Sequence, residues 1–288
     1  MNASTTLYGT AINDIKIAKE AGFEGIELLH DKLYRYFDAG FEMDSLKPFL
    51  KDIKVVGMGN LYDIERQGKD YESLISEANK MFMTAKAVGA PMVQLCTGPV
   101  DSAIVRDFVA GKVGPDDKRY KGFLGKSINE TINYTAKNVS VLSEIADQYG
   151  IELYIEPVSW TPINTIEKAI EVIEKSGKKN VGIVIDFWHI WTAGESPDNI
   201  AKLDKDLIKG VHFCDGLEFD RTTVPNQVIL RDVWTGAGSI PLKEYTNAIK
   251  STGYNGWFSC ELFCKKILEQ DYLTTAKTLR QFMEYILL

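Results

Sequence analysis

Side chains that can bind a divalent metal ion stand at the ends of strand-like segments in the second half of the sequence. These side chains are Glu156, Asp186, His212 and Glu261, which end the segments Ile151–Glu156, Val181–Asp186, Gly210–His212 and Gly256–Glu261. If the segments are consecutive strands of one parallel barrel, the side chains converge at one mouth, where such barrels carry their active sites. Buried carboxylates are costly without a cation, so several in one pocket require a metal ion or bound protons. The pattern therefore predicts a divalent-metal site.

The donor set determines which ion and which ligand would suit this site. Carboxylate oxygens with one imidazole favour Mn²⁺, with Mg²⁺, Co²⁺ or Zn²⁺ as further candidates. Four protein ligands on an octahedral ion leave two adjacent positions free. A carbonyl with a neighbouring hydroxyl group can chelate there, so the site fits a small keto-sugar.

The remaining histidines of the chain also lie close to predicted strand ends. His189 stands three residues after Asp186, in the motif Asp-Phe-Trp-His, and the chain has only three histidines. We expect His189 to lie in the pocket and to contact a substrate oxygen. His30 follows the predicted strand Gly25–Leu29 and could line the pocket or cap a loop.

The elements that must position these residues alternate along all 288 residues. The other predicted strands are Asn2–Tyr8, Gly25–Leu29, Lys54–Met58 and Pro91–Cys96. The predicted helices are Ile12–Ala21, Ser45–Lys51, Tyr71–Val88, Ile128–Gln148, Thr165–Lys175, Pro197–Leu203, Leu242–Ser251 and Leu268–Ile286. Short strands that alternate with helices indicate a parallel sheet. With about eight such units and no linker, we predict an α/β fold, a (β/α)8 TIM barrel, in which residues 1–288 form a single domain.

Two connections, residues 98–126 and 214–239, are longer than usual and would hang over the mouth of the barrel. The first carries the cations Arg106, Lys112, Lys118, Arg119 and Lys121. It could be a lid that holds an anionic substrate, or a solvated loop or oligomer contact. Charged loops are usually just exposed, which favours the second interpretation.

Composition narrows the classes of function. The chain has 33 basic and 40 acidic residues and a net charge of −7, which argues against a nucleic-acid surface. No apolar run reaches bilayer length and no signal peptide is recognisable, so we expect a soluble, cytoplasmic protein without a membrane partner. Its four cysteines form no CxxC pair, in keeping with a reducing compartment.

Longer motifs around the potential ligands resemble the xylose isomerase-like barrel superfamily. They are Glu156-Pro157, Asp186-Phe-Trp-His189, His212-Phe-Cys-Asp215, Trp234-Thr-Gly-Ala-Gly-Ser-Ile-Pro and Gly253-Tyr-Asn-Gly-Trp-Phe-Ser-Cys-Glu261-Leu-Phe. The resemblance runs from the segment AKEAGFEGIELL to the last helix. It is strongest to the sugar isomerase and epimerase branch, which includes the inosose isomerases.

This resemblance implies an activity and roles for individual residues. Glu156, Asp186, His212 and Glu261 match the family's metal ligands, and Glu156 and Glu261 match its paired acid and base. His189 and Arg231 match residues that contact the substrate. The implied reaction is isomerisation or epimerisation of a ketose or inosose, by proton transfer through an enediolate bound to the metal ion. The chain could also form a homo-oligomer.

Other activities remain open from the sequence. The same enediolate could expel a hydroxyl group as water, which would make the protein an inosose-type dehydratase. A barrel can also be a non-catalytic sugar-binding or complex subunit, because fold alone does not establish activity. A DNA-repair endonuclease of the same superfamily would need more histidines and a less acidic surface.

Overall fold

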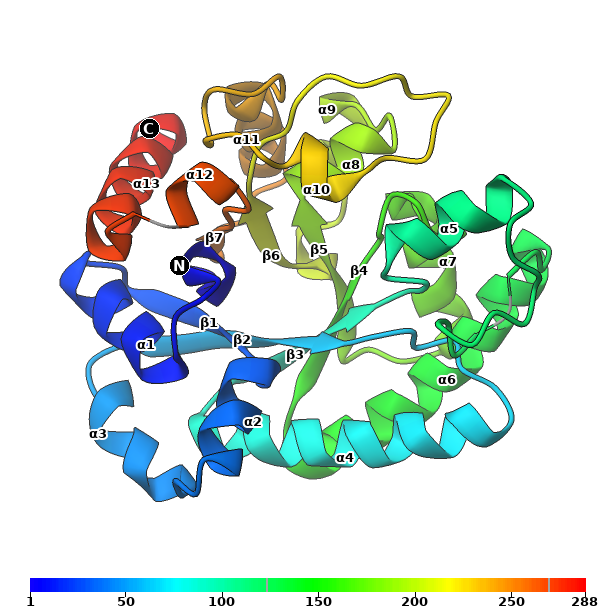
Figure 1. Ribbon diagram of the computed structural model, residues 1–288, viewed down its shortest axis with the longest axis horizontal. Helices are drawn as coiled ribbons and strands as arrows, with labels where there is room; N and C mark the ends of the chain where they lie inside the picture. Colours follow the sequence, from blue (N-terminus) through cyan, green and yellow to red (C-terminus); the bar gives the residue numbers. More distant parts are fainter. Residues whose placement is uncertain (123, 269) are drawn as a thin grey trace.

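The computed structural model describes residues 1–122, 124–268 and 270–288. Within these residues, seven parallel strands follow one another in chain order and curve into a nearly closed barrel (Figure 1). They are β1 (Gly25–Leu29), β2 (Lys54–Leu61), β3 (Met92–Cys96), β4 (Glu152–Glu156), β5 (Val181–Asp186), β6 (Ile208–Phe213) and β7 (Phe258–Cys260). Because every neighbouring pair is parallel, the carboxyl ends of all the strands lie at the same mouth. The predicted TIM barrel is confirmed.

The gap between β7 and β1 is closed by the first residues of the chain. Asn2 forms a parallel bridge with Glu27, and its backbone N–H donates to the carbonyl of Cys260 at 3.1 Å. The predicted strand Asn2–Tyr8 is wrong beyond Asn2, because the chain then turns into the 3-10 helix η1 (Ala3–Thr6). The side chain of Asn2 causes this turn by accepting a hydrogen bond from the Ser4 N–H at 2.8 Å.

Helices pack around the outside of the barrel (Figure 1). They are α1 (Ala11–Glu20), α2 (His30–Asp38), α3 (Lys47–Leu50), α4 (Lys69–Val88), α5 (Ser102–Val109), α6 (Ile128–Tyr149), α7 (Ile166–Ser176), α8 (Phe187–Thr192), α9 (Pro197–Ile200), α10 (Gln227–Leu230), α11 (Leu242–Ser251), α12 (Lys265–Leu268) and α13 (Tyr272–Leu287), with the 3-10 turns η2 (Met43–Leu46) and η3 (Lys205–Leu207). The long helices α4 and α6 lie side by side. None of the described helices is long and apolar enough to cross a membrane.

Several helices differ from the sequence-based expectation. Helices α2, α5, α8, α10 and α12 were not predicted, and the predicted helix Ser45–Lys51 is split between η2 and α3. The predicted helix Leu268–Ile286 includes residue 269, which lies outside the described residues. Its described part forms α13 from Tyr272 on, and Asp271 caps the start of this helix by accepting from the Thr274 N–H at 2.9 Å.

The interior of the barrel is filled below the mouth by aromatic side chains. Trp257 occupies the space that a side chain at Gly210 would need, which explains the glycine in the middle of β6. Its indole meets the Tyr154 ring edge-on at 6.1 Å between centroids and lies 6.2 Å from the His212 ring. Packed aromatic side chains therefore lie directly below the site at the mouth of the barrel.

The connection 98–126 is ordered by helix α5 and by a small apolar cluster of Ile104, Tyr120 and Leu124. Four of its cations are exposed: Arg119 pairs with Asp107 and Asp117, and Lys121 pairs with Glu77. Arg106 is half-buried and donates to Ser102 Oγ and to the Pro225 carbonyl. None of the five predicted lid cations is among the residues that line the pocket described below. This arrangement agrees with a solvated loop and not with a cationic lid.

Candidate metal centre

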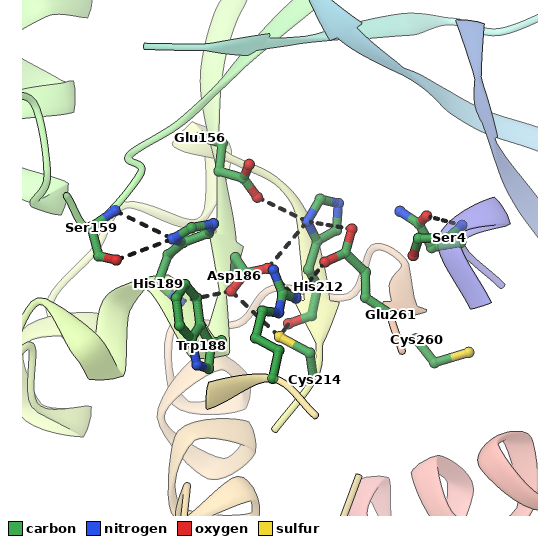
Figure 2. A network of polar contacts seen from close by, with 12 residues as sticks. Ser4, Glu156, Ser159, Asp186, Trp188, His189, His212, Cys214, Cys260 and Glu261 are labelled. Atoms are coloured by element: carbon green, nitrogen blue, oxygen red, sulfur yellow. Dashed lines mark hydrogen bonds and ion pairs between the residues drawn. The ribbon is translucent and has the colours of Figure 1, made fainter. Parts of the chain in front are cut away.

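The structure brings the four predicted ligands together at the mouth of the barrel (Figure 2). Glu156 and Asp186 are the last residues of β4 and β5, His212 lies in β6, and Glu261 directly follows β7. Asp186 pairs in register with His212, which explains why these side chains lie at the same level. All four are buried, and even the most accessible, Glu261, is only 9% exposed.

One nitrogen of the His212 ring faces all three carboxylates. Its Nδ1 atom lies 3.2 Å from Glu156 Oε1 and 3.7 Å from both Asp186 Oδ2 and Glu261 Oε1. Asp186 Oδ2 is buried without a hydrogen-bond partner. A buried oxygen without a donor is costly unless it meets a cation, so this observation and the donor set both fit a divalent metal ion. One oxygen or nitrogen atom each of Asp186, His212 and Glu261 lies within 4.8 Å of the others, as required for shared ligation.

The other nitrogen of His212 faces Glu27, a residue to which the sequence analysis gave no role. His212 Nε2 lies 3.2 Å from Glu27 Oε1 and 3.1 Å from Glu27 Oε2. Glu27 sits in the middle of β1 and is completely buried. A charged residue inside the otherwise apolar segment GIELL was the signal that could have revealed it, because an inward-facing carboxylate needs a partner.

Helix α8 positions His189 beside Asp186. The Oδ1 atom of Asp186 caps this helix by accepting from the His189 backbone N–H at 2.8 Å, which leaves Oδ2 to face the centre. The backbone N–H of Ser159 donates to His189 Nδ1 at 3.2 Å. The ring proton of His189 is therefore on Nε2, and the residue lines the pocket, as predicted.

Arg231 approaches from the end of α10. Its Nη2 atom lies 2.8 Å from Glu261 Oε2 and 3.6 Å from Asp186 Oδ2. The guanidinium carbon is 4.1 Å from the centre of the Phe263 ring and 5.1 Å from that of Trp188. These two aromatic faces hold the planar group in place.

Burial and nearby charges give the site residues different affinities for protons. Burial raises the pKa of Glu261 to about 7, although His212 and Arg231 act in the opposite direction. Burial would also raise the pKa of Asp186, but Arg231 and His212 outweigh burial and lower that pKa. Burial lowers the pKa of His189, which keeps its ring neutral. Burial alone would lower the pKa of His212 as well, but the surrounding carboxylates raise it well above its usual value.

A pocket of about 280 Å³ opens above the centre. Its lining includes Glu156, His189, Arg231 and Glu261, together with His30, Asp31, Asn60 and Tyr62. His30 thus lines the pocket, as one of the two expectations stated, and its ring also accepts from the Asn60 N–H at 2.9 Å. Among the described lining residues, Arg231 is the only lysine or arginine.

The sequence and the fold of the chain are similar to those of known proteins. The chain is 28% identical over 286 residues to the inosose isomerase of Halalkalibacterium halodurans, a match that covers 96% of this chain and 92% of that enzyme. It is 22% identical over 273 residues to the 3-dehydroshikimate dehydratase of Pseudomonas aeruginosa, covering 91% of this chain and 37% of the dehydratase. The crystal structure of the IolI protein with a bound zinc atom has a TM-score of 0.84 at 22% identity, and covers 100% of this chain and 96% of that one. The profile of the Xylose isomerase-like TIM barrel family matches residues 15–284, and the chain therefore belongs to this family.

Proposed function

We propose that this protein is a divalent-metal-dependent isomerase or epimerase of an inosose or a similar uncharged ketose. The observation that carries the proposal is the position of Glu156 and Glu261, two carboxylates that flank His212 Nδ1 and line one small pocket. The similarity to inosose isomerases supports the substrate class. The bound zinc atom in the structure of the IolI protein, which has a similar fold, supports a metal ion in this protein.

Glu156, Asp186, His212 and Glu261 would hold the metal ion. When bound, the ion would supply Lewis-acid chemistry by drawing electron density from a substrate carbonyl. We take Mn²⁺ as the first candidate, because oxygen ligands dominate the donor set, with Mg²⁺, Co²⁺ and Zn²⁺ as alternatives.

The chain's own residues would move the protons. One of Glu156 and Glu261 removes a proton from the carbon beside the carbonyl, and the electron pair of the broken C–H bond forms the enediolate. The other carboxyl group returns a proton to the opposite face of the same carbon, which gives epimerisation. Alternatively, a proton returns to the neighbouring carbon while another moves from the hydroxyl oxygen to the former carbonyl oxygen, which gives isomerisation. His189 can donate its Nε2 proton to a substrate oxygen that gains negative charge. Arg231 holds Glu261 in place through the 2.8 Å contact.

The charge of the pocket favours a neutral substrate over an anionic one. Arg231 is the only lysine or arginine among its described lining residues, and Arg231 already contacts Glu261 and Asp186. Asp31 adds a negative charge at the rim. A carboxylate such as that of 3-dehydroshikimate would find no unpaired cation there, so the dehydratase alternative is better framed as the dehydration of a neutral inosose. The presence of two suitably placed carboxyl groups argues against a non-catalytic sugar-binding subunit.

Deuterium exchange would test this proposal. The protein is incubated with Mn²⁺ in D₂O with a panel of inososes and ketoses, the ion is removed, and proton NMR spectra are recorded. We expect deuterium at the carbon beside the carbonyl of one compound, together with an isomer or epimer of it. A product with a new conjugated double bond would instead establish a dehydratase. Absence of exchange across the panel, with the metal ion bound, would contradict the proposal.

A further inference from the structure

The buried carboxylate of Glu27 lies on the far side of His212 from the candidate metal centre. Both of its oxygens are within 3.2 Å of His212 Nε2. At the opposite edge of the ring, Nδ1 faces the carboxylates of Glu156, Asp186 and Glu261. The His212 ring therefore stands between a single carboxylate on one side and a group of three on the other.

Two further donors fix the orientation of Glu27. The Nδ2 atom of Asn2 donates to Glu27 Oε2 at 2.8 Å, and the hydroxyl of Tyr154 donates to Glu27 Oε1 at 2.5 Å. Asn2 is itself held, because its side-chain oxygen accepts from the Ser4 N–H. Gly57 leaves room for the Tyr154 hydroxyl, since a Cβ atom at that position would lie 2.7 Å from it. The carboxylate thus has a defined place in the packed interior of the barrel.

These contacts determine which nitrogen of His212 carries the proton. A carboxylate that receives hydrogen bonds from Asn2 and Tyr154 is an acceptor, so its contact with His212 requires a hydrogen on Nε2. In the neutral ring the lone pair is then on Nδ1, which faces Glu156, Asp186 and Glu261. Without an acceptor at Nε2, the three carboxylates would draw the proton to Nδ1 and block that atom as a ligand.

We propose that Glu27 is a positioning residue that accepts a hydrogen bond from Nε2 of His212 and thereby directs Nδ1, the lone-pair nitrogen of the neutral ring, at the metal ion. This inference rests on the proposed metal-dependent function. Carboxylates that accept from a ligating histidine fix its tautomer and make it a stronger ligand, and their removal commonly weakens metal binding. Glu27 would act only through His212, because it does not line the substrate pocket.

Metal affinity provides the test. Zn²⁺ is titrated into the full-length protein in competition with a chromophoric chelator, for the wild type, Glu27→Gln and the control Glu24→Gln. Glu24 is exposed and directly precedes the same strand. We expect Glu27→Gln to bind Zn²⁺ about 10–100-fold more weakly, and Glu24→Gln to match the wild type. A second variant, Tyr154→Phe, removes one hydrogen bond to Glu27 without changing charge and should weaken binding about two- to tenfold.

A tautomer measurement separates this role from a merely structural one. With only three histidines, the ring nitrogens of the zinc-loaded, ¹⁵N-histidine-labelled protein can be assigned by long-range ¹H–¹⁵N NMR. We expect His212 to carry its proton on Nε2 and to bind zinc through Nδ1. Circular dichroism and thermal unfolding in chelator establish that each variant is folded.

The possible failures can be told apart. If the wild type binds zinc and Glu27→Gln binds it equally well, or if His212 binds through Nε2, the role of Glu27 is refuted while the metal centre stands. If the folded wild type binds neither Zn²⁺ nor Mn²⁺, the proposed function fails, and the inference about Glu27 fails with it.

Discussion

Arg231 and Glu261 form the shortest ion pair of the candidate centre, with 2.8 Å between Nη2 and Oε2. The same nitrogen lies 3.6 Å from Asp186 Oδ2, so one guanidinium group forms ion pairs with two carboxylates. Glu156 has a different neighbour, the Sγ atom of Cys96 at 3.6 Å from its Oε2. The two candidate acid and base groups are therefore placed in unlike surroundings, as expected if they exchange protons with a substrate from different sides.

Removal of the Arg231 charge should slow the reaction strongly. In Arg231→Gln, the partly formed negative charge on the substrate and the carboxylate of Glu261 lose their cation, and we expect kcat to fall about 10²–10³-fold. The matched control is Arg221→Gln, which removes an exposed arginine from the same connection. Both variants are assayed at saturating metal with the substrate identified by deuterium exchange. An Arg231→Gln enzyme with near wild-type kcat would contradict a role of this residue in the reaction.

Replacement of either candidate acid or base should stop proton transfer while the fold survives. We expect Glu156→Gln and Glu261→Gln to lose about 10²–10⁴-fold in the rate of deuterium exchange. Because both residues are also proposed ligands, the rates are compared at metal concentrations that saturate each variant. Glu152→Gln, in the same strand β4 but at its exposed end, is the control. Full exchange activity in either of the first two variants would remove that residue from the proposed mechanism.

Metal binding should release protons and strengthen as the pH rises. Burial raises the pKa of Glu261 to about 7, and neighbouring carboxylates raise the pKa of His212 well above its usual value. A metal ion must displace these protons before the two residues can act as ligands, so its affinity should increase from pH 5.5 through pH 7. Calorimetric titrations of the chelator-treated protein with Mn²⁺, in buffers of different ionisation enthalpy, measure the protons released. An affinity that does not change over this range would contradict the assigned ligand set.

The sequence was sufficient to predict the barrel and the residues that meet at its mouth. Parallel strands that are buried on both faces appear in the sequence as continuous apolar runs. Each such run ended on a polar residue, and in a parallel barrel these residues all lie at the carboxyl-terminal mouth. The positions of Asp186 and His212 therefore followed from periodicity alone. The role of Arg231 did not follow in this way, because it comes from a long connection whose path no periodic pattern describes.

Other parts of the structure depend on contacts between distant residues. Glu27 faces inward because Asn2, Tyr154 and His212 offer hydrogen bonds, and these partners come from three separate parts of the chain. Of the predicted strand Asn2–Tyr8, only a bridge at Asn2 forms, because the Asn2 side chain caps a 3-10 turn. The pattern of apolar residues does not reveal such a turn. Helix α8 was missed since its buried sequence FWHIWT has no polar face.

A second buried carboxyl group, away from the candidate metal centre, should make stability depend on pH. Burial, together with the nearby charge of Asp63, raises the pKa of Glu65 from 4.5 to about 7, although Tyr120 and the Gly98 N–H donate hydrogen bonds to it. In the unfolded chain this group ionises at its ordinary pKa, and in the folded protein only at the higher one. The unfolded state therefore loses its proton first as the pH rises, and the folded state loses stability between pH 4.5 and about 7.

The variant Glu65→Gln should lack this contribution. Relative to the wild type, its free energy of unfolding should increase between pH 5 and pH 8, by at most about 3 kcal/mol for a shift of this size. Urea denaturation of both proteins in chelator, at several pH values, measures the difference, and contributions from all other groups cancel in it. The control Glu24→Gln should show no such trend. If Glu65→Gln and the wild type change in parallel with pH, then Glu65 is already ionised in the folded protein, and its contacts with Tyr120 and Gly98 stabilise the charged form at least as much as burial opposes it.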